Sequence, residues 1–299
     1  MKIVFFGTPD FSVYPLKKLV ASGYDVAAVV TVPDKPQGRG LKLKYSPVKE
    51  FALESGIPVI QPDSLKSTEF EEELKKVNAS LFIVVAFKIL PPNIFNLPEH
   101  GSFNLHGSLL PQYRGAAPIQ WALINGDKLT GLTTFKLAEK VDTGNIYLRK
   151  EIVINDDDDF GSLYYRMAEN GAGLVIDTVE LIKSGDFKLL PQNNSAATPA
   201  PKITKEMCEI DFNNDVLKIH NLIRGLSPVP GAFFTHGGKS IKIYKSKISN
   251  EISLNPGELK NYSGKFLAGC KDGSLEILEL QQEGKKRMIA DEFLRGFRF

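Results

Sequence analysis

KIVFFGTPDFSVYPLKKLVASGYDVAAVVTV, residues 2–32, is the stretch that decides the fold of the first half of the chain. It begins with a short apolar run that ends at Gly7, continues with apolar residues at helical spacing, and returns to a second apolar run. The alternation continues downstream and predicts strands at Ile3–Phe6, Val26–Val32 and Leu81–Phe87 and helices at Phe11–Val20 and Val48–Leu53. Strands that alternate with helices form mostly parallel sheets, so we predict an α/β, Rossmann-like domain. Such sheets bind ligands beyond the carboxyl ends of their strands, where we therefore expect the functional residues.

The second half of the chain follows a polar stretch and has a different pattern. Pro191–Lys205 is rich in turn-forming and extended residues, and apolar periodicity is lost there. Beyond it, Val216–Leu226 has the pattern of a helix, and short strands with glycine turns follow, including a hairpin at Asp272-Gly273. The predicted domains are a first domain of residues 1–189, a linker of residues 190–205, and a small β-barrel-like (OB-like) domain of residues 206–299.

Composition excludes several classes of protein. Hydrophobic residues make up 42% of the 299 residues, which is enough for at least one large core. The net charge of +2 is too small to indicate a nucleic-acid-binding protein by itself. Cys208 and Cys270 are the only cysteines, which excludes a disulfide framework and is typical of a reducing compartment. The first apolar run is too short for a signal peptide, and no run approaches the roughly 20 residues of a membrane-spanning helix. We therefore expect a cytoplasmic protein without a membrane partner.

FNLHGSLLP, residues 103–111, is the most informative stretch for chemistry. In a strand that ends near Leu105, Asn104 and His106 are two residues apart and point to the same side of the sheet. An amide donor and a titratable imidazole then share one face at the carboxyl end of a strand. The Gly-Ser-Leu-Leu-Pro that follows lets the chain turn tightly, so its backbone amides could bind a planar ligand.

Acyl transfer to an amine needs a donor aimed at the oxyanion, a group that moves a proton, and a group that fixes the tautomer of that proton carrier. Asn104 and His106 can supply the first two. Asp142, in the Lys-Val-Asp-Thr-Gly of residues 140–144, can supply the third if the fold brings it near His106. Each of the three residues taken alone is more often a turn or hydrogen-bonding residue, so only their combination indicates catalysis.

The stretch NLHGSLLPQYRGAAPIQW, residues 104–121, resembles the signature of formyltransferases that use 10-formyltetrahydrofolate. Within that group, its RGAAPIQ part is similar to the methionyl-tRNA formyltransferase family. The similarity extends to further short segments along the chain: GTPDF at residues 7–11, PDKP at 33–36, GRG at 38–40, VDTG at 141–144 and SPVPGA at 227–232. The resemblance therefore covers nearly the whole chain.

The resemblance implies specific roles for these residues. Asn104, His106 and Asp142 would be the catalytic set, and the folate pocket would be lined by Ser108, Leu109, Leu110 and Pro111. The implied reaction transfers the formyl group of 10-formyltetrahydrofolate to the α-amino group of methionyl-initiator tRNA, with no metal. One departure is VVAFKILP at residues 84–91, where relatives commonly have Tyr-Gly and one more residue. It concerns the pterin pocket and not the reaction.

The loop of residues 33–49 carries a local charge of +4. Its basic residues are Lys35, Arg39, Lys42, Lys44 and Lys49, against the single acid Asp34. A solvated surface loop is the plainer interpretation, but the resemblance implies that this loop contacts tRNA through Arg39 and its neighbouring lysines. Residues 205–299 are also slightly basic, with a net charge of +3 against −1 for residues 1–204. We expect the protein to bind its tRNA as a monomer.

Two other functions compete with this one. The first is formyl transfer from folate to a different acceptor, such as an amino sugar nucleotide or a purine precursor; a hydrolase of formylfolate belongs to the same class. The second is folate or RNA binding without catalysis. The four acids Asp156–Asp159 lack the spacing of a calcium loop and are interpreted as a solvated turn, and His220 as an ordinary residue of a helix face.

Overall fold

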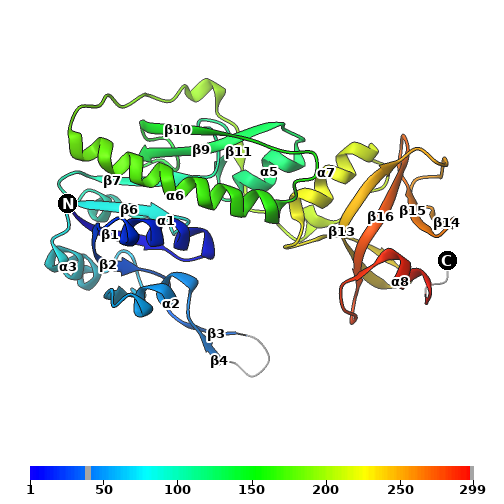
Figure 1. Ribbon diagram of the computed structural model, residues 1–299, viewed down its shortest axis with the longest axis horizontal. Coiled ribbons are helices and arrows are strands. Elements are labelled where there is room, and N and C mark those ends of the chain that lie inside the picture. Colours follow the sequence, from blue (N-terminus) through cyan, green and yellow to red (C-terminus); the bar gives the residue numbers. More distant parts are fainter. Residues whose placement is uncertain (38–41, 297–299) are drawn as a thin grey trace. The chain divides into compact units, whose positions relative to one another are not determined.

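The computed structural model describes residues 1–37 and 42–296 and divides the chain into two compact units (Figure 1). The first unit contains residues 1–115, 131–152 and 164–199. The second contains residues 116–130, 153–163 and 200–299, so two short segments from the middle of the chain belong to it. Each unit is described by itself below.

The first unit is built on a central sheet with both parallel and antiparallel strands. In spatial order its strands are β10 (Ile146–Val153), β9 (Leu129–Lys136), β7 (Ser102–His106), β6 (Leu81–Val85), β1 (Lys2–Gly7), β2 (Asp25–Val30) and β5 (Val59–Ile60). The pairs from β7 to β5 are parallel, and β9 runs antiparallel to β7. The predicted mostly parallel, Rossmann-like sheet is therefore confirmed.

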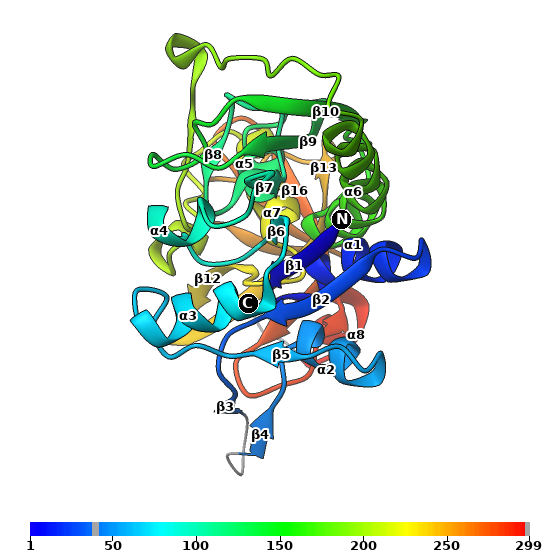
Figure 2. The ribbon, with the colours of Figure 1, turned by 90° about the vertical axis from the view of Figure 1, so that its left-hand side faces the viewer.

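Helices cover both faces of this sheet (Figure 2). One face carries α1 (Asp10–Ala21), α2 (Pro47–Glu54) and α6 (Phe160–Ser184), and the other carries α3 (Thr68–Val77) and α4 (Pro92–Phe95). The strands are apolar on both sides because both sides are buried: Val4 and Phe6 of β1 pack with Phe70 of α3, whereas Ile3 and Phe5 alternate to the other side and are fully buried. The remaining short elements of this unit are β3 (Lys35–Gln37), β4 (Lys42–Lys44), β8 (Arg114–Gly115) and the 3-10 turn η1 (Asn194–Ala196).

Two predicted strands end earlier than expected. The strand expected to reach Val32 ends at Val30, and the strand expected to reach Phe87 ends at Val85. After β6 the reason is local, because Ala86 has φ of 46°, a left-handed conformation that cannot continue a strand. After β2, the Thr31 hydroxyl bonds the Ser46 hydroxyl that caps α2, and the chain leaves the sheet there.

The second unit is an antiparallel sheet covered by a helix. Its strands follow the order β12 (Ala232–His236), β13 (Lys239–Ser249), β16 (Ser274–Gln282), β15 (Lys265–Gly269) and β14 (Leu259–Tyr262), with β17 (Met288–Ile289) also paired to β16. The other elements are α5 (Pro118–Ile124), β11 (Pro199–Ala200, whose first residue is assigned to the first unit), η2 (Glu206–Cys208), α7 (Val216–Leu226) and α8 (Ala290–Leu294). The expected OB-like barrel is not confirmed, because no sheet closes on itself among the described strands.

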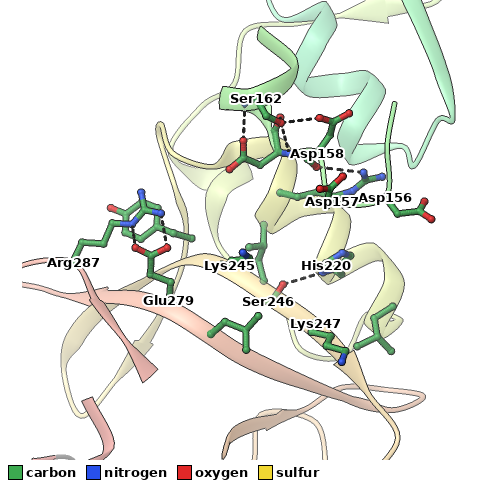
Figure 3. Close-up of a pocket in the computed structure, with 16 residues that line it drawn as sticks. Asp156, Asp157, Asp158, Ser162, His220, Lys245, Ser246, Lys247, Glu279 and Arg287 are labelled. Atoms are coloured by element: carbon green, nitrogen blue, oxygen red, sulfur yellow. Dashed lines mark hydrogen bonds and ion pairs between the residues drawn. The ribbon is translucent and has the colours of Figure 1, made fainter. Parts of the chain in front are cut away.

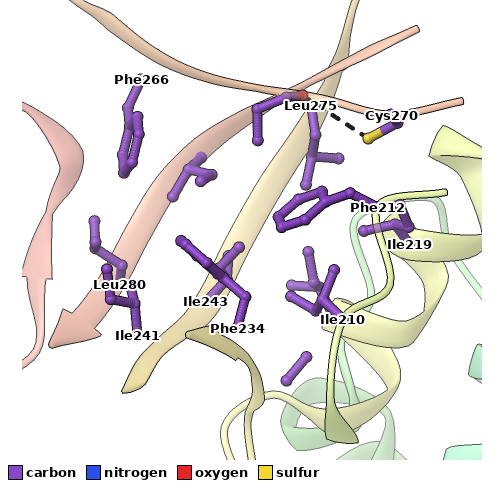
Figure 4. Packing of buried hydrophobic residues seen from close by; sticks show 14 of the residues in the cluster. Ile210, Phe212, Ile219, Phe234, Ile241, Ile243, Phe266, Cys270, Leu275 and Leu280 are labelled. Atoms are coloured by element: carbon purple, nitrogen blue, oxygen red, sulfur yellow. Dashed lines mark hydrogen bonds between the residues drawn. The ribbon is translucent and has the colours of Figure 1, made fainter. Parts of the chain in front are cut away.

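The core of the second unit lies between α7 and the sheet (Figure 4). Ile219, Ile223 and Leu226 recur at helical spacing and are almost completely buried, so this stripe of α7 faces the strands. The predicted hairpin at Asp272-Gly273 is present between β15 and β16, and the Asp272 carboxylate accepts a 2.7 Å hydrogen bond from Val216 N at the start of α7. The hairpin turn thus also caps the helix.

Candidate active site

Strand β7 places Asn104 and His106 on one face of the first sheet. Between them, Leu105 turns to the opposite face, where its side chain packs against Gly171 of α6. His106 is 6% exposed and its ring lies edge-on to Phe135 of β9, which pairs with Asn104 in the sheet. Within the part of the chain that the structure describes, the Asn104 amide has no protein hydrogen-bond partner, so its donors remain available to a ligand.

The two ring nitrogens of His106 face different groups. Nε2 lies 2.8 Å from the backbone carbonyl oxygen of Tyr113, and Nδ1 lies 3.8 Å from Oδ2 of Asp142. A carbonyl oxygen only accepts, so Nε2 carries the hydrogen of this bond. The tautomer is thus fixed by Tyr113, whereas sequence reasoning gave that role to Asp142. At 3.8 Å the carboxylate is too far from Nδ1 for a direct hydrogen bond.

Asp142 is held in one position by its surroundings. Its backbone has φ of 52°, in the left-handed region that costs energy for a residue other than glycine. Its Oδ2 accepts a 2.8 Å hydrogen bond from Gly115 N. Two residues later, a Cβ on Gly144 would lie 1.6 Å from the carbonyl oxygen of Lys136, so only glycine fits at this position. The structure therefore brings Asp142 next to His106.

Arg114 and Gln192 belong to this site, although sequence reasoning gave neither of them a role. Arg114 donates through Nε and Nη2 to the side-chain oxygen of Gln192, at 3.2 and 2.6 Å. Gln192 in turn donates to the carbonyl oxygens of Asp142 and Gly144, at 2.9 and 2.7 Å. Arg114 stands in the quoted signature, but Gln192 lies in the polar stretch interpreted as a linker, where no local pattern distinguishes it.

The turn expected to bind folate is held by internal hydrogen bonds. The Ser108 hydroxyl donates to the Gln112 carbonyl oxygen, and the Thr133 hydroxyl both donates to Ser108 O and accepts from Leu110 N. Leu110 O accepts from Arg149 at 2.6 Å, and the Leu110 side chain is buried. The main-chain groups of Leu110 are thus already engaged. The side chains of Leu109 and Pro111 remain partly exposed.

The basic loop forms a two-stranded hairpin, β3 with β4. Lys35 and Lys44 pair across it and their side chains are exposed. Arg39 lies outside the described residues, and of Lys42 only the backbone in β4 is described.

The base of this hairpin is anchored by an ion pair. Lys49 Nζ contacts Asp34 Oδ2 at 2.5 Å and Gln61 Oε1 at 2.7 Å, and it lies 4.2 Å from the centre of the Tyr45 ring. The hydrogen bonds from Lys49 and Gln61 lower the pKa of Asp34, because they stabilise its ionised form. Lys49 therefore anchors the loop and is not one of its free cations.

A second polar cluster surrounds Asp10, which follows β1 at the carboxyl edge of the sheet. Its carboxylate accepts hydrogen bonds from Tyr164 at 2.6 Å and from Tyr165 at 3.3 Å. Burial, followed by the hydrogen bond and charge of Asp10, raises the pKa of Tyr164 well above its ordinary value, so its hydroxyl stays protonated. The contact ties the start of α1 to α6.

The second unit contains a cavity of about 680 Å³ between residues 156–162, α7, β13 and β16 (Figure 3). Asp158, expected in a solvated turn, is 4% exposed and accepts hydrogen bonds from Asn155 N and the Ser162 hydroxyl. His220 Nδ1 lies 3.0 Å from the Ser246 hydroxyl, and burial together with the nearby Arg224 lowers the pKa of His220. None of the three predicted catalytic residues lines this cavity.

Two features are absent from the described residues. Among residues 1–37 and 42–296, no helix is long and apolar enough to cross a bilayer. In the same residues, no group of three or more His, Cys, Asp or Glu side chains is arranged to hold a metal ion.

Known proteins resemble this chain along nearly its whole length. Residues 1–179 match the formyl transferase family, and residues 202–298 match the formyl transferase C-terminal domain. The methionyl-tRNA formyltransferase of Caldanaerobacter subterraneus subsp. tengcongensis is 47% identical over 99% of this chain and 97% of its own. That of Bacteroides fragilis is 46% identical over 99% of this chain and 95% of its own.

Among solved structures, the N-formyltransferase of Helicobacter canadensis, in complex with folinic acid and dTDP-3-aminofucose, has a TM-score of 0.70 at 22% identity. The match covers 96% of this chain and 100% of the other. This last likeness concerns the fold.

Proposed function

Since this chain belongs to the methionyl-tRNA formyltransferase family, we propose that it transfers the formyl group of 10-formyltetrahydrofolate to the α-amino group of methionyl-initiator tRNA. The product is N-formylmethionyl-tRNA for translation initiation. The observation that carries this function is the position of Asp142 beside His106, on the strand that also carries Asn104, with Nδ1 of His106 3.8 Å from the Asp142 carboxylate.

In the proposed reaction the uncharged amine attacks the formyl carbon directly. A bond forms between the amine nitrogen and this carbon, the bond from the carbon to folate N10 breaks, one proton leaves the attacking nitrogen, and N10 gains one. The side-chain amide of Asn104, which has no partner among the described residues, donates a hydrogen bond to the formyl oxygen, on which negative charge develops. No enzyme-bound acyl intermediate is needed, which agrees with the burial of both cysteines.

His106 moves the proton in this scheme, and its geometry selects the nitrogen involved. Because Nε2 donates to the Tyr113 carbonyl, Nδ1 is the nitrogen left to accept and return a proton. The Asp142 carboxylate beside Nδ1 stabilises the positive charge that the ring carries between these two steps. Ser108, Leu109, Leu110 and Pro111 form the folate-facing turn, in which Leu109 and Pro111 offer exposed apolar surface.

We assign tRNA contact to the basic hairpin. Lys35 and Lys44 are exposed on it, and Arg39 and Lys42 add to its charge. Residues 1–189 would carry the chemistry, residues 206–299 would bind tRNA, and residues 190–205 would link them.

Arg39→Ala should lower kcat/KM for methionyl-tRNA and reduce the salt slope of binding by about one. Unchanged kinetics and salt dependence would remove this loop from the proposal. We also propose that the protein is cytoplasmic and monomeric, and light scattering tests the oligomeric state.

An acceptor assay tests the function itself. The purified chain is incubated with 10-formyltetrahydrofolate and, in separate reactions, with methionyl-tRNA, an amino sugar nucleotide or a purine precursor, and the formylated products are measured. Formylation of methionyl-tRNA alone is expected. Turnover of another acceptor without methionyl-tRNA would overturn the assignment, and formate release without any acceptor would indicate a hydrolase.

A further inference from the structure

The side-chain amide of Gln192 is saturated in a way that only glutamine allows. Its oxygen accepts two hydrogen bonds from Arg114, and its nitrogen donates to the carbonyl oxygens of Asp142 and Gly144. If the amide were rotated by 180°, its NH2 group would face the Arg114 guanidinium and its oxygen would face the two carbonyl oxygens. Glutamate would keep the bonds to Arg114 but face the same two carbonyls with an acceptor. The site therefore selects a group that accepts on one side and donates on the other.

Arg114 is the middle residue of the segment 113–115, which contacts the side chains of His106 and Asp142. On one side of it, the Tyr113 carbonyl accepts from His106; on the other, Gly115 N donates to Asp142. Thr198 also holds this segment, since Tyr113 N donates to the Thr198 hydroxyl and Arg114 N donates to the Thr198 carbonyl oxygen. The position of residues 113–115 thus sets where both His106 and Asp142 lie.

The loop that carries Asp142 needs such support. Asp142 and Tyr113 both have left-handed backbones, with φ of 52° and 58°. Such conformations cost of order 1–3 kcal/mol each and persist only where the surroundings determine them. Gln192 supplies two of the hydrogen bonds that hold residues 142–144, and through Arg114 it joins this loop to residues 113–115. Beside the bond from Gly115 N to the Asp142 carboxylate, it is a second side-chain link between the two backbone segments that contact the His106 ring and Asp142.

We propose that Gln192, acting with Arg114, is a positioning residue that holds the Asp142 carboxylate at its working distance from Nδ1 of His106. The inference rests on the proposed function for its kinetic consequence but not for its structural one. Gln192 has no bond to the His106 ring or to the Asp142 carboxylate; it bonds the backbone of Asp142. A displacement of about 1 Å at a catalytic group can cost on the order of 100-fold in rate. Loss of the amide should therefore lower kcat while substrate binding is retained.

The test compares Gln192→Glu and Gln192→Met with the wild type and with Asn194→Ala. Asn194 is the matched control, because it accepts a 2.8 Å hydrogen bond from Arg114 but has no described bond to residues 142–144. We expect kcat to fall about 10- to 100-fold in both Gln192 variants, with KM for each substrate within about threefold and a changed pH profile of kcat. Asn194→Ala should stay within about threefold of the wild type in kcat.

Hydrogen exchange provides a readout that does not depend on the reaction. Backbone amides of residues 140–145 should exchange about tenfold faster in both Gln192 variants and at the wild-type rate in Asn194→Ala. An inactive wild type would disprove the proposed function, yet this exchange pattern would still support the structural link. The inference is overturned by kcat within twofold of the wild type in both Gln192 variants, by an equal loss in Asn194→Ala, or by failure of both Gln192 variants to fold, which would make the network a general stabiliser.

Discussion

His106 and His220 are both largely buried histidines with one ring nitrogen engaged by a hydrogen bond, but their charged neighbours have opposite signs. His106, on β7, donates from Nε2 to a backbone carbonyl and has the Asp142 carboxylate 3.8 Å from Nδ1. His220, on α7, bonds the Ser246 hydroxyl through Nδ1 and lies near the Arg224 guanidinium. Burial and that guanidinium lower the pKa of His220.

The difference matches the role of proton carrier that we propose for His106 and the structural role that we propose for His220. A carboxylate beside an available nitrogen lets an imidazole hold a proton during a reaction, whereas a neighbouring cation keeps a buried imidazole neutral. The sequence distinguishes the two through the Asn104–His106 pattern and the family resemblance, but not through the charge beside each ring. The sign of the neighbouring charge is a property of the tertiary structure, and the variants below test whether it decides function.

The largest effect is expected for His106→Ala. Loss of the proton carrier should lower formyl transfer by about 100- to 10,000-fold in single-turnover assays, with little change in the binding of methionyl-tRNA. The matched variant His220→Asn should retain turnover within about threefold, since His220 has a structural role in this comparison. Near-normal turnover in His106→Ala would disprove the mechanism, and an equal loss in His220→Asn would remove the distinction between the two histidines.

Asn104→Ala removes the amide that we assign to the developing oxyanion. A single oxyanion donor contributes about 100- to 1,000-fold to kcat, so kcat should fall by this factor with a smaller change in KM. The His106→Ala, Asn104→Ala double variant should lose less than the product of the two single losses, because both residues act on the same transition state. Fully multiplicative losses would show that the two residues act independently.

Asp142→Asn tests the negative charge beside His106 while keeping an oxygen that can accept from Gly115 N. Without the carboxylate, the positive charge on His106 loses its nearest counter-charge, and kcat should fall by about 10- to 100-fold. Thermal unfolding should change little, because the bond from Gly115 persists. If the variant instead loses stability and keeps its kcat, Asp142 is a loop anchor and the contrast with His220 does not rest on charge.

Much of this site follows from the sequence because its central part is local. Asn104 and His106 are two residues apart on one strand, so strand periodicity places them on the same face. Asp142 is distant in sequence, and its approach to His106 was expected only from the resemblance. The sheet and α7 were predicted because their apolar periods are regular, whereas the extents of β2 and β6 were not, since a side-chain bond and a left-handed alanine end them.

The supporting network could not be found from the sequence. Gln192 lies in an irregular stretch whose composition is typical of a linker, and irregular segments choose their hydrogen-bond partners through the tertiary structure. Lys49 adds to the predicted charge of the basic loop because composition does not reveal ion pairs, and the structure pairs it with Asp34. The tautomer of His106 depends on the Tyr113 carbonyl, a backbone atom that every sequence contains.

The smallest expected effect concerns the pH dependence of stability and the neutral state of His220. Its pKa is lowered in the folded protein, so as the pH falls through about 6.5 the unfolded chain binds the proton first and the folded state is destabilised. One histidine can contribute at most about 1.4 kcal/mol per pH unit to this loss. Urea unfolding at pH 7.5 and 5.5 should therefore show a smaller loss of unfolding free energy at the lower pH in His220→Asn than in the wild type.

The exposed His100, replaced by Asn, is the control and should follow the wild type. Parallel losses in all three proteins would mean that Arg224 and burial do not hold His220 neutral, and the contrast with His106 would then rest on the Asp142 carboxylate alone.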